Sequence, residues 1–359
     1  MKKSVLFAAG MLLLPFAVIA QEEEAKLKIS GSVDTYYKYD FSGNANIGTS
    51  FANEQNSISI GMLDLKLEKA SGKASFMAEL SFGPRSRGSV GPGPVVTVGS
   101  GERAVDITEY IPSLQNLYVS YAFTDKFSVT AGYMGTFVGY ELIQPTGNFN
   151  YSTSYLFTNG PFQNAGVKAQ YAFSDKISVM AGLFNPWNVY TADPSVGPTS
   201  IGGQLKISPV ENWNIYLNAI GGAQNVNGTI LDLTTSWQVT DDLLIGLNAA
   251  RNSDGADTAA AFTGAAAYLN YALTSSVALG LRYEHFEATA GKGIFKDAQG
   301  TPLDAAVNAF TLSANIGAGD LTLVPELRLD AASMPVFLDA DGSPVKSAFQ
   351  ALIAAVYAF

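Results

Sequence analysis

The sequence predicts an all-β fold, a transmembrane antiparallel up-and-down β-barrel of about 16 strands. Three observations predict it. Apolar and polar residues alternate along most of the chain, short turns alternate with long polar loops, and no apolar run after residue 20 is long enough for a membrane helix. Only 14% of the residues are charged, against roughly 25% in typical soluble proteins. A chain this apolar, without apolar helices, must place its apolar residues on strands.

The alternation is clearest near the end of the chain. Residues 321–330 (LTLVPELRLD) place leucines on one face and charged side chains on the other, and residues 349–359 alternate up to the terminal Phe359. A terminal apolar strand in a soluble protein would leave an edge open to aggregation. Pairing with a first strand near Lys26–Tyr39 removes both edges, so we expect the barrel to close there, with Phe359 at the periplasmic interface.

The connections between strands are of two kinds. The motif YAFTDKFSVTAGY (121–133) returns as YAFSDKISVMAGL (171–183), and each copy reads as strand, tight turn and strand. Short turns of this kind are expected near Ser71, Asp125, Asp175, Glu211, Asp241, Ser275 and Gly319. Long loops are expected at 42–56, 84–111, 140–163, 188–199, 223–228, 252–258, 288–305 and 332–346.

Short periplasmic turns and long external loops are typical of bacterial outer-membrane barrels. The competing interpretation is a large soluble β-sandwich or solenoid. Such a protein needs a polar outward face, whereas here an aliphatic face recurs strand after strand. The pattern therefore favours the barrel.

Residues 1–20 are predicted to be a cleaved signal peptide, and residues 21–359 the outer-membrane β-barrel. Lys2 and Lys3 precede an apolar run, and Val18 and Ala20 are small enough to precede a cleavage site. The alternative is a membrane anchor, but the run is short and no basic cluster follows it. We therefore expect export, with the cell outer membrane as the destination.

Composition excludes several classes of function. The net charge of −10 argues against nucleic acid as a partner, since phosphate binding needs a basic surface. With no cysteine and one histidine, typical zinc sites are excluded, and we expect no metal, cofactor or disulfide. His285 has the parity of outward-facing residues, and no serine or aspartate arrangement accompanies it. Scattered inward acids are better explained as pore lining than as a catalytic acid pair, so we expect no enzyme.

Assigning the aliphatic face to lipid gives a set of charged side chains for the lumen. The reverse assignment would put these charges into hydrocarbon, at roughly 2–4 kcal/mol for each Lys or Arg near the midplane. The predicted pore-lining residues are Asp34, Lys38, Asp64, Lys66, Glu68, Glu79, Lys168, Lys206, Asp232, Arg282, Glu284, Glu326, Arg328 and Asp330. Acids and bases are nearly balanced, which predicts at most a mild preference for cations.

The second strand does not follow this assignment throughout. Ile58, Ile60 and Met62 share the parity of the inward charges that begin at Asp64. The sequence allows either a β-bulge or an apolar patch in the lumen at this point.

Sixteen strands enclose more volume than their side chains can fill, so we expect an aqueous channel narrowed by loops. The candidate for the constriction is residues 141–162, which are long, aromatic and poor in charge. Arg85, Arg87 and Arg103 lie in the second long loop and are candidates for a positive field at the mouth. An ordinary flexible external loop is the alternative for that segment.

One block carries a family resemblance. Residues 148–173 (NFNYSTSYLFTNGPFQNAGVKAQYAF), followed by 179–188 (VMAGLFNPWN), resemble the β-barrel porin-2 family of OmpL-like outer-membrane porins of Gram-negative bacteria. A Pro-Trp pair stands where we expect Gly-Trp in the family. The matching positions, which are also the constriction-loop candidates, are Asn150, Tyr151, Ser152, Pro161 and Phe162.

The resemblance implies a porin or porin-like channel. The balanced lumen charges favour a wide, water-filled and weakly selective pore for passive diffusion of small hydrophilic solutes. Two alternatives stay open: a closed or plugged barrel acting as an adhesin or surface receptor, and a substrate-selective channel using the inward tyrosines Tyr36, Tyr118 and Tyr216. The expected partners are outer-membrane lipid, small solutes and, through Phe359, the barrel-insertion machinery. A homotrimer is expected only by analogy with other sixteen-stranded porins.

Overall fold

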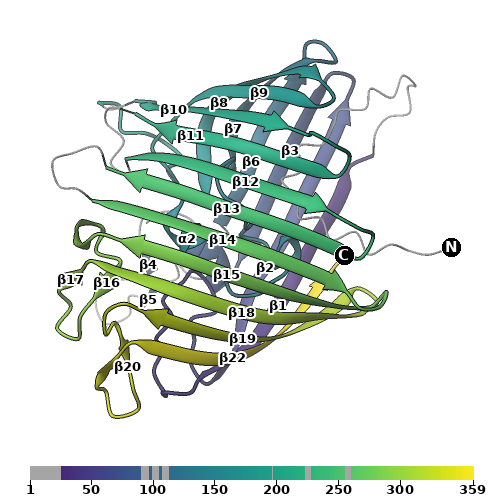
Figure 1. The fold of residues 1–359 in the computed structure, drawn as a ribbon. Coiled ribbons are helices and arrows are strands. Elements are labelled where there is room, and N and C mark those ends of the chain that lie inside the picture. The colour runs from purple at the N-terminus through teal and green to yellow at the C-terminus, as the bar shows by residue number, and fades with distance from the viewer. Residues whose placement is uncertain are drawn as a thin grey trace.

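Sixteen antiparallel strands pair in chain order and close into one barrel, which confirms the predicted fold class (Figure 1). The computed structural model describes residues 26–89, 97–98, 105–106, 113–195, 197–222, 228–254 and 260–359. The barrel strands are β1 (Lys28–Asp40), β2 (Ser57–Ser71), β3 (Ala74–Phe82), β6 (Ser113–Ala122), β7 (Phe127–Gly135), β8 (Gln163–Ser174), β9 (Ile177–Phe184), β10 (Ser200–Ile207), β11 (Trp213–Gly221), β12 (Thr229–Gln238), β13 (Leu243–Ser253), β14 (Ala261–Ala272), β15 (Val277–Ala288), β18 (Ala305–Ala318), β19 (Leu321–Ala332) and β22 (Ser347–Ala358).

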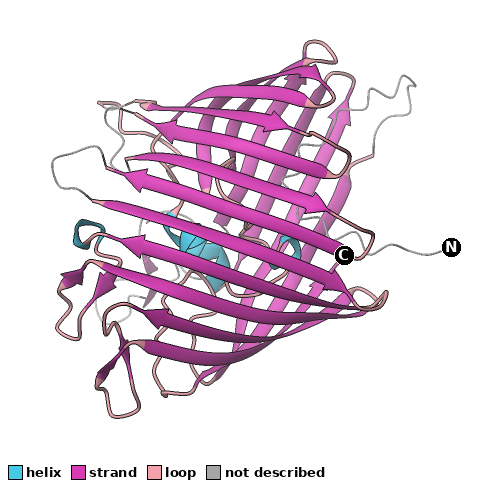
Figure 2. Ribbon diagram, viewed as in Figure 1, coloured by secondary structure: helices cyan, strands magenta, loops and turns pink. Residues whose placement is uncertain are grey.

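The seven predicted short turns all connect consecutive strands at one end of the barrel, and the longer loops connect strands at the other. Figure 2 shows that strands make up the wall and that helical segments are few and short. Within the described ranges, no helix is long and apolar enough to cross a membrane. The small elements are α1 (Pro84–Ser89), η3 (Pro145–Gly147), α2 (Tyr155–Asn159), η4 (Ala290–Lys292) and the hairpins β4–β5 (Thr97–Val98, Val105–Asp106), β16–β17 (Phe295–Lys296, Pro302–Leu303) and β20–β21 (Phe337–Leu338, Pro344–Val345).

The barrel closes where β1 meets β22. Val33 lies opposite Tyr357 in an antiparallel register that runs through both strands. The last residue continues the ladder, because the Phe359 amide donates to the Gly31 carbonyl at 3.0 Å and the Gly31 amide donates to the Phe359 carbonyl at 3.0 Å. Both strand edges are thereby hydrogen-bonded, as membrane insertion of a sheet requires.

Burial alternates along the strands as predicted, with the polar set inside and the aliphatic set outside. Aromatic pairs gather on the outer face near the short turns, as in the interfacial belts of membrane proteins. Ring centroids lie 4.9 Å apart in Tyr121–Phe123, 5.0 Å in Tyr171–Phe173 and 5.1 Å in Trp213–Trp237. The two copies of the repeated motif supply the first two of these pairs.

A β-bulge resolves the parity problem in β2. Val33 pairs with Leu63 and Thr35 pairs with Ile60, so β2 uses one extra residue between these pairs. Ile58 is 86% exposed on the outer face, whereas Met62 is buried inside. The extra residue changes the parity of the strand, so the first of the two open alternatives, the bulge, is the correct one.

Two external loops are joined above the seam between β1 and β22. Asn44 Nδ2 donates to the Asp339 carbonyl at 2.8 Å. Asn46 Nδ2 donates to the Leu338 carbonyl at 2.9 Å, and the Leu338 amide returns a hydrogen bond of 2.8 Å to Asn46 Oδ1. These contacts connect the first and last long loops and hold that side of the barrel mouth in place.

A candidate channel constriction

The connection between β7 and β8, residues 136–162, folds into the barrel; we call it the inner loop. Figure 1 shows its helix α2 inside the ribbon wall rather than at the external end. Tyr151, Tyr155 and Leu156 are buried against wall residues. The chain segment predicted to form the constriction therefore lies in the lumen.

Hydrogen bonds within the inner loop fix its local structure. The Asn148 side chain makes two hydrogen bonds to the Leu142 backbone. Its Oδ1 accepts from the Leu142 amide at 2.8 Å, and its Nδ2 donates to the Leu142 carbonyl at 2.6 Å. Ser154 caps α2, because its hydroxyl accepts from the Phe157 amide at 3.0 Å. Side chains of this kind bind the local backbone and fix turns and helix starts.

Two wall carboxylates bind backbone amides of the inner loop. Glu284 on β15 accepts from Tyr155 N and Leu156 N, each at 2.8 Å, at the first turn of α2. Glu326 on β19 accepts from Tyr151 N at 2.8 Å and Ser152 N at 3.2 Å. Hydrogen bonds to an ionised carboxylate are about twice as strong as neutral ones, so these four amides hold the loop firmly.

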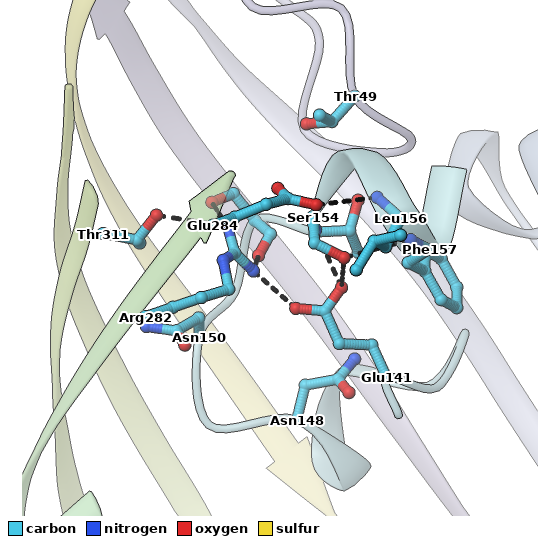
Figure 3. Close-up of polar contacts among 12 residues, drawn as sticks. Thr49, Glu141, Asn148, Asn150, Ser154, Leu156, Phe157, Arg282, Glu284 and Thr311 are labelled. Carbon is cyan, nitrogen blue, oxygen red and sulfur yellow. Dashed lines mark hydrogen bonds and ion pairs between the residues drawn. The ribbon is translucent and has the colours of Figure 1, made fainter. Parts of the chain in front are cut away.

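Two wall arginines bind the loop from the same side. Arg282 lies next to Glu284 on β15 and donates to Glu141 Oε1 at 2.5 Å and to the Ser152 carbonyl at 2.6 Å (Figure 3). Arg328 donates to the Thr153 carbonyl at 2.8 Å. Both guanidinium groups are buried, and a buried charge is tolerated only where it is paired and hydrogen-bonded. Arg282 is paired with Glu141 of the loop, and Arg328 is paired with Asp330 of the wall.

Two loop tyrosines extend this network to two further wall acids. The Tyr155 hydroxyl donates to Asp330 Oδ2 at 2.8 Å, and the Tyr151 hydroxyl bonds to Asp34. Burial, together with the neighbouring Asp330 carboxylate, raises the pKa of Tyr155 well above its usual value. The phenol therefore remains protonated and stays a donor to the acid.

Glycines of the wall make room for the side chains of the inner loop. A Cβ atom at Gly280 would come within 2.1 Å of the Phe149 ring, and one at Gly246 within 2.3 Å of the Tyr140 hydroxyl. A Cβ at Gly202 would lie 2.5 Å from the Phe137 ring, and one at Gly264 would make a tight contact of 3.0 Å with Leu156. These four inward glycines, on β10, β13, β14 and β15, form a floor on which the loop packs at close range.

A cavity of about 120 Å³ remains between the loop and the wall formed by β6, β11 and β12. The wall contributes amides, hydroxyls and the Tyr216 ring, and the loop contributes mainly aromatic and aliphatic side chains together with Thr136, Glu141 and Gln144. Among the described residues that line it, Glu141 alone is charged, and its carboxylate turns toward Arg282 and Ser154. The inner loop therefore occupies part of the lumen and leaves beside it a cavity whose one charged lining side chain, among the described residues, is already paired.

All the predicted pore-lining residues lie on the inward face of their strands. Those that contact the inner loop are Asp34, Glu79, Asp232, Arg282, Glu284, Glu326, Arg328 and Asp330. The others are Lys38, Asp64, Lys66, Glu68, Lys168 and Lys206. In the first group, side chains such as Arg282, at 0% exposure, bind the inner loop.

The constriction-loop candidates all belong to the inner loop, but each plays its own part. Asn150 Nδ2 donates to Ser313 on the wall at 2.7 Å, and Tyr151 and Ser152 bind the wall carboxylates and arginines already described. Pro161 is buried. Phe162 packs against Phe157, with ring centroids 5.0 Å apart.

Of the three arginines predicted for the mouth, Arg85 is the one whose side chain the structure describes, and it lies in the interior. Arg85 is 2% exposed, donates to the Tyr151 carbonyl at 3.0 Å and lies 4.6 Å above the Phe51 ring. Arg85 therefore binds the inner loop in the barrel interior, where its guanidinium contacts the Phe51 ring and the Tyr151 carbonyl. The side chain of Arg87 and the whole of Arg103 lie outside the described residues.

Sequence reasoning did not single out Glu141, Tyr155, Phe149 or the inward glycines. Glu141 had a usable signal, since it is the one charged residue of the segment 136–162. A single acid in an aromatic loop needs a partner, and Arg282 supplies it. Within the described ranges, no group of three or more acidic or histidine side chains could hold a metal ion.

The family comparison decides what kind of barrel this is. The description "Putative beta-barrel porin-2, OmpL-like" matches residues 26–359. The chain belongs to this porin family. This confirms the resemblance seen in the sequence and makes the protein an outer-membrane channel. No curated protein sequence matches the chain significantly.

Solved porins share the fold at low sequence identity. OmpF from Salmonella typhi, in complex with daunomycin, is 9% identical, with a TM-score of 0.61 over 94% of this chain and 98% of that one. The anion-selective porin from Comamonas acidovorans is 11% identical, with a TM-score of 0.58 over 94% and 100%. The trimer form of Vibrio cholerae OmpT is 11% identical, with a TM-score of 0.57 over 94% and 100%.

Proposed function

We propose that this porin passes small hydrophilic solutes by passive diffusion and discriminates only weakly between ions. The observation that carries this proposal is the cavity beside the inner loop, which we take to be the passage and whose one charged lining side chain among the described residues, Glu141, is paired with Arg282. The two buried arginines of the lumen are each paired with an acid: Arg282 with Glu141, and Arg328 with Asp330. Compensated charges produce little net field across the passage, and ion selectivity depends on that field.

A charge placed in the passage should change this behaviour. Ser236 lines the cavity and is only partly buried, so it has room for a larger side chain. We expect Ser236→Asp to shift the reversal potential toward cation selectivity and Ser236→Lys to shift it toward anion selectivity. Single-channel recording in a planar bilayer under a salt gradient measures both shifts.

The matched control places the same charge far from the passage. Gln299 is exposed between β16 and β17, and Gln299→Lys should leave the reversal potential close to that of the unaltered channel. If the two Ser236 variants and the control behave alike, ions do not use this passage. If a folded barrel does not conduct at all, the result favours the alternative function, that of a plugged barrel acting as a surface receptor or adhesin. The contacts that join the two external loops above the seam favour that alternative.

Family and fold indicate a non-enzymatic channel. His285 supports this assignment, because it is exposed on the outer face and its Nδ1 lies 3.0 Å from Asn308 Oδ1. An outward imidazole bound to an amide has no nucleophile to activate. We propose that it is a polar residue at the external membrane interface.

We propose that residues 1–20 direct export and are removed, and that three copies assemble in the outer membrane. The basic start and apolar run support the first proposal, and the trimer form recorded for the Vibrio cholerae neighbour supports the second. The intact mass of the mature protein, and its assembly size in detergent, test them. A mature chain that retains Met1 would contradict the proposed cleavage. A monomer that conducts would contradict the proposed trimer.

We also propose that Phe359 is read by the barrel-insertion machinery. It is exposed, and its backbone ends the closing strand pair. Phe359→Ala should lower the amount of folded barrel in the outer membrane, measured by heat-modifiable migration. Phe349→Ala is the control, since Phe349 is an exposed aromatic residue on the same strand. Equal losses in both variants would show that only lost apolar surface matters.

A further inference from the structure

The passage beside the inner loop combines two kinds of surface. The wall contributes the amides of Gln163 and Asn214 and the hydroxyls of Thr234 and Ser236. Aromatic rings, among them Tyr140 and Tyr216, line the same space. Sites that recognise small polar molecules commonly pair apolar and aromatic surface with a few placed polar groups.

One polar group in this lining lacks a partner. Gln163 is 0% exposed, and its amide nitrogen donates to Gln115 Oε1 at 2.6 Å. Its Oε1 has no hydrogen-bond partner among the described residues. A buried acceptor left unpaired is unfavourable, so a solute donor that enters the cavity, with a small shift of the lining side chains, would gain a hydrogen bond to it.

The charges near the passage are directed away from it or lie beside it. Glu141 is bound by Arg282 and by Ser154, whose amide and hydroxyl each donate at 2.7 Å. The Lys206 ammonium lies 5.9 Å from the centroid of the Tyr216 ring, and Lys206 is not part of the lining. An ion entering this space would lose water without gaining a counter-charge, which is unfavourable. An uncharged solute avoids that penalty.

We propose that the passage selects uncharged, polyhydroxylated solutes, the chemical class of small sugars. Sugar hydroxyls both donate and accept, so they can bind the Gln163 carbonyl and the amides and hydroxyls of the wall. The apolar C–H faces of a sugar ring match the aromatic side of the passage. This inference rests on the proposed function, because it names the solute class of the same channel.

Liposome swelling with three solutes of similar size tests the inference. Glucose is neutral, gluconate is an anion and glucosamine is a cation. We expect glucose to enter several-fold faster than either charged solute. Gln163→Met and Tyr216→Leu should each reduce the glucose rate and, with it, the advantage of glucose over gluconate and glucosamine. Using two variants keeps the test valid if one of them does not fold.

Lys206→Gln supplies the matched comparison. This change removes the charge beside the passage without altering its lining, so the advantage of glucose should persist. Equal entry of the three solutes through a conducting channel would overturn the sugar inference and leave the proposed porin function standing. A folded barrel that passes neither ions nor any of the three solutes would overturn the proposed function itself.

Discussion

Replacing Arg282 by methionine is expected to widen the channel. Methionine retains much of the apolar stem but removes the guanidinium, which donates to Glu141 at 2.5 Å, to the Ser152 carbonyl at 2.6 Å and to Thr311 at 3.1 Å. Glu141 would then remain buried without its cation. Breaking a buried ion pair by removing one partner costs about 3–5 kcal/mol. The inner loop should relieve that cost by leaving the wall.

The measurement is the mean single-channel conductance, together with the noise of the open state. We expect both to rise in Arg282→Met, because a loosened loop obstructs less of the lumen and moves within it. Arg251→Met is the control, since Arg251 is an exposed arginine on β13. It removes the same charge from the same barrel without touching the loop.

A second change should reverse much of the first. In Arg282→Met/Glu141→Gln, neither member of the pair is charged, so Glu141 no longer leaves a buried carboxylate without its cation, and Glu284 keeps its two backbone amide donors. Residues in direct contact typically couple by 0.5–3 kcal/mol, and the double variant should accordingly conduct more like the original channel than Arg282→Met does. If Arg282→Met conducts like Arg251→Met, the ion pair does not hold the loop.

The barrel itself could be predicted because strand alternation, turn residues and closure are local or statistical properties of the sequence. Parity alone put Arg282 and Glu284 on the inward face, and the structure agrees. The bulge in β2 was one of two alternatives, and the pairing of Val33 and Thr35 with β2 was needed to choose between them. Local pattern thus determines which way a side chain points.

What an inward side chain touches could not be predicted in the same way. Glu141 and Arg282 are 141 residues apart, and their contact depends on the path of the inner loop through the barrel. The same applies to Arg85, which the sequence suggested for the mouth but which binds Tyr151 in the interior. Contacts made by a long loop depend on the tertiary fold, so side-chain parity predicts the inner surface but not its partners.

Gly280, one of the four inward glycines, shows most clearly that contacts cannot be predicted from the sequence. Its substitution is the second change for which we expect a large effect on the channel. Gly280 in the sequence is one glycine among 35, and only the structure places the Phe149 ring over it. A Cβ atom there would lie 2.1 Å and 2.2 Å from two ring carbons. Gly280→Val must therefore displace Phe149, at the cost of about 1–3 kcal/mol that overpacking usually carries.

Since Phe149 belongs to the inner loop, we expect Gly280→Val to raise the conductance and to expose the loop to proteolysis, while the barrel stays folded. Gly203→Val is the control, because Gly203 is on the outer face and its nearest neighbour would be 3.5 Å from the new Cβ. Phe149→Ala should restore the original loop position in the Gly280→Val background by removing the clashing ring. A Gly280→Val channel with unchanged conductance and unchanged protease resistance would mean that the loop packs on β15 less closely than the structure places it.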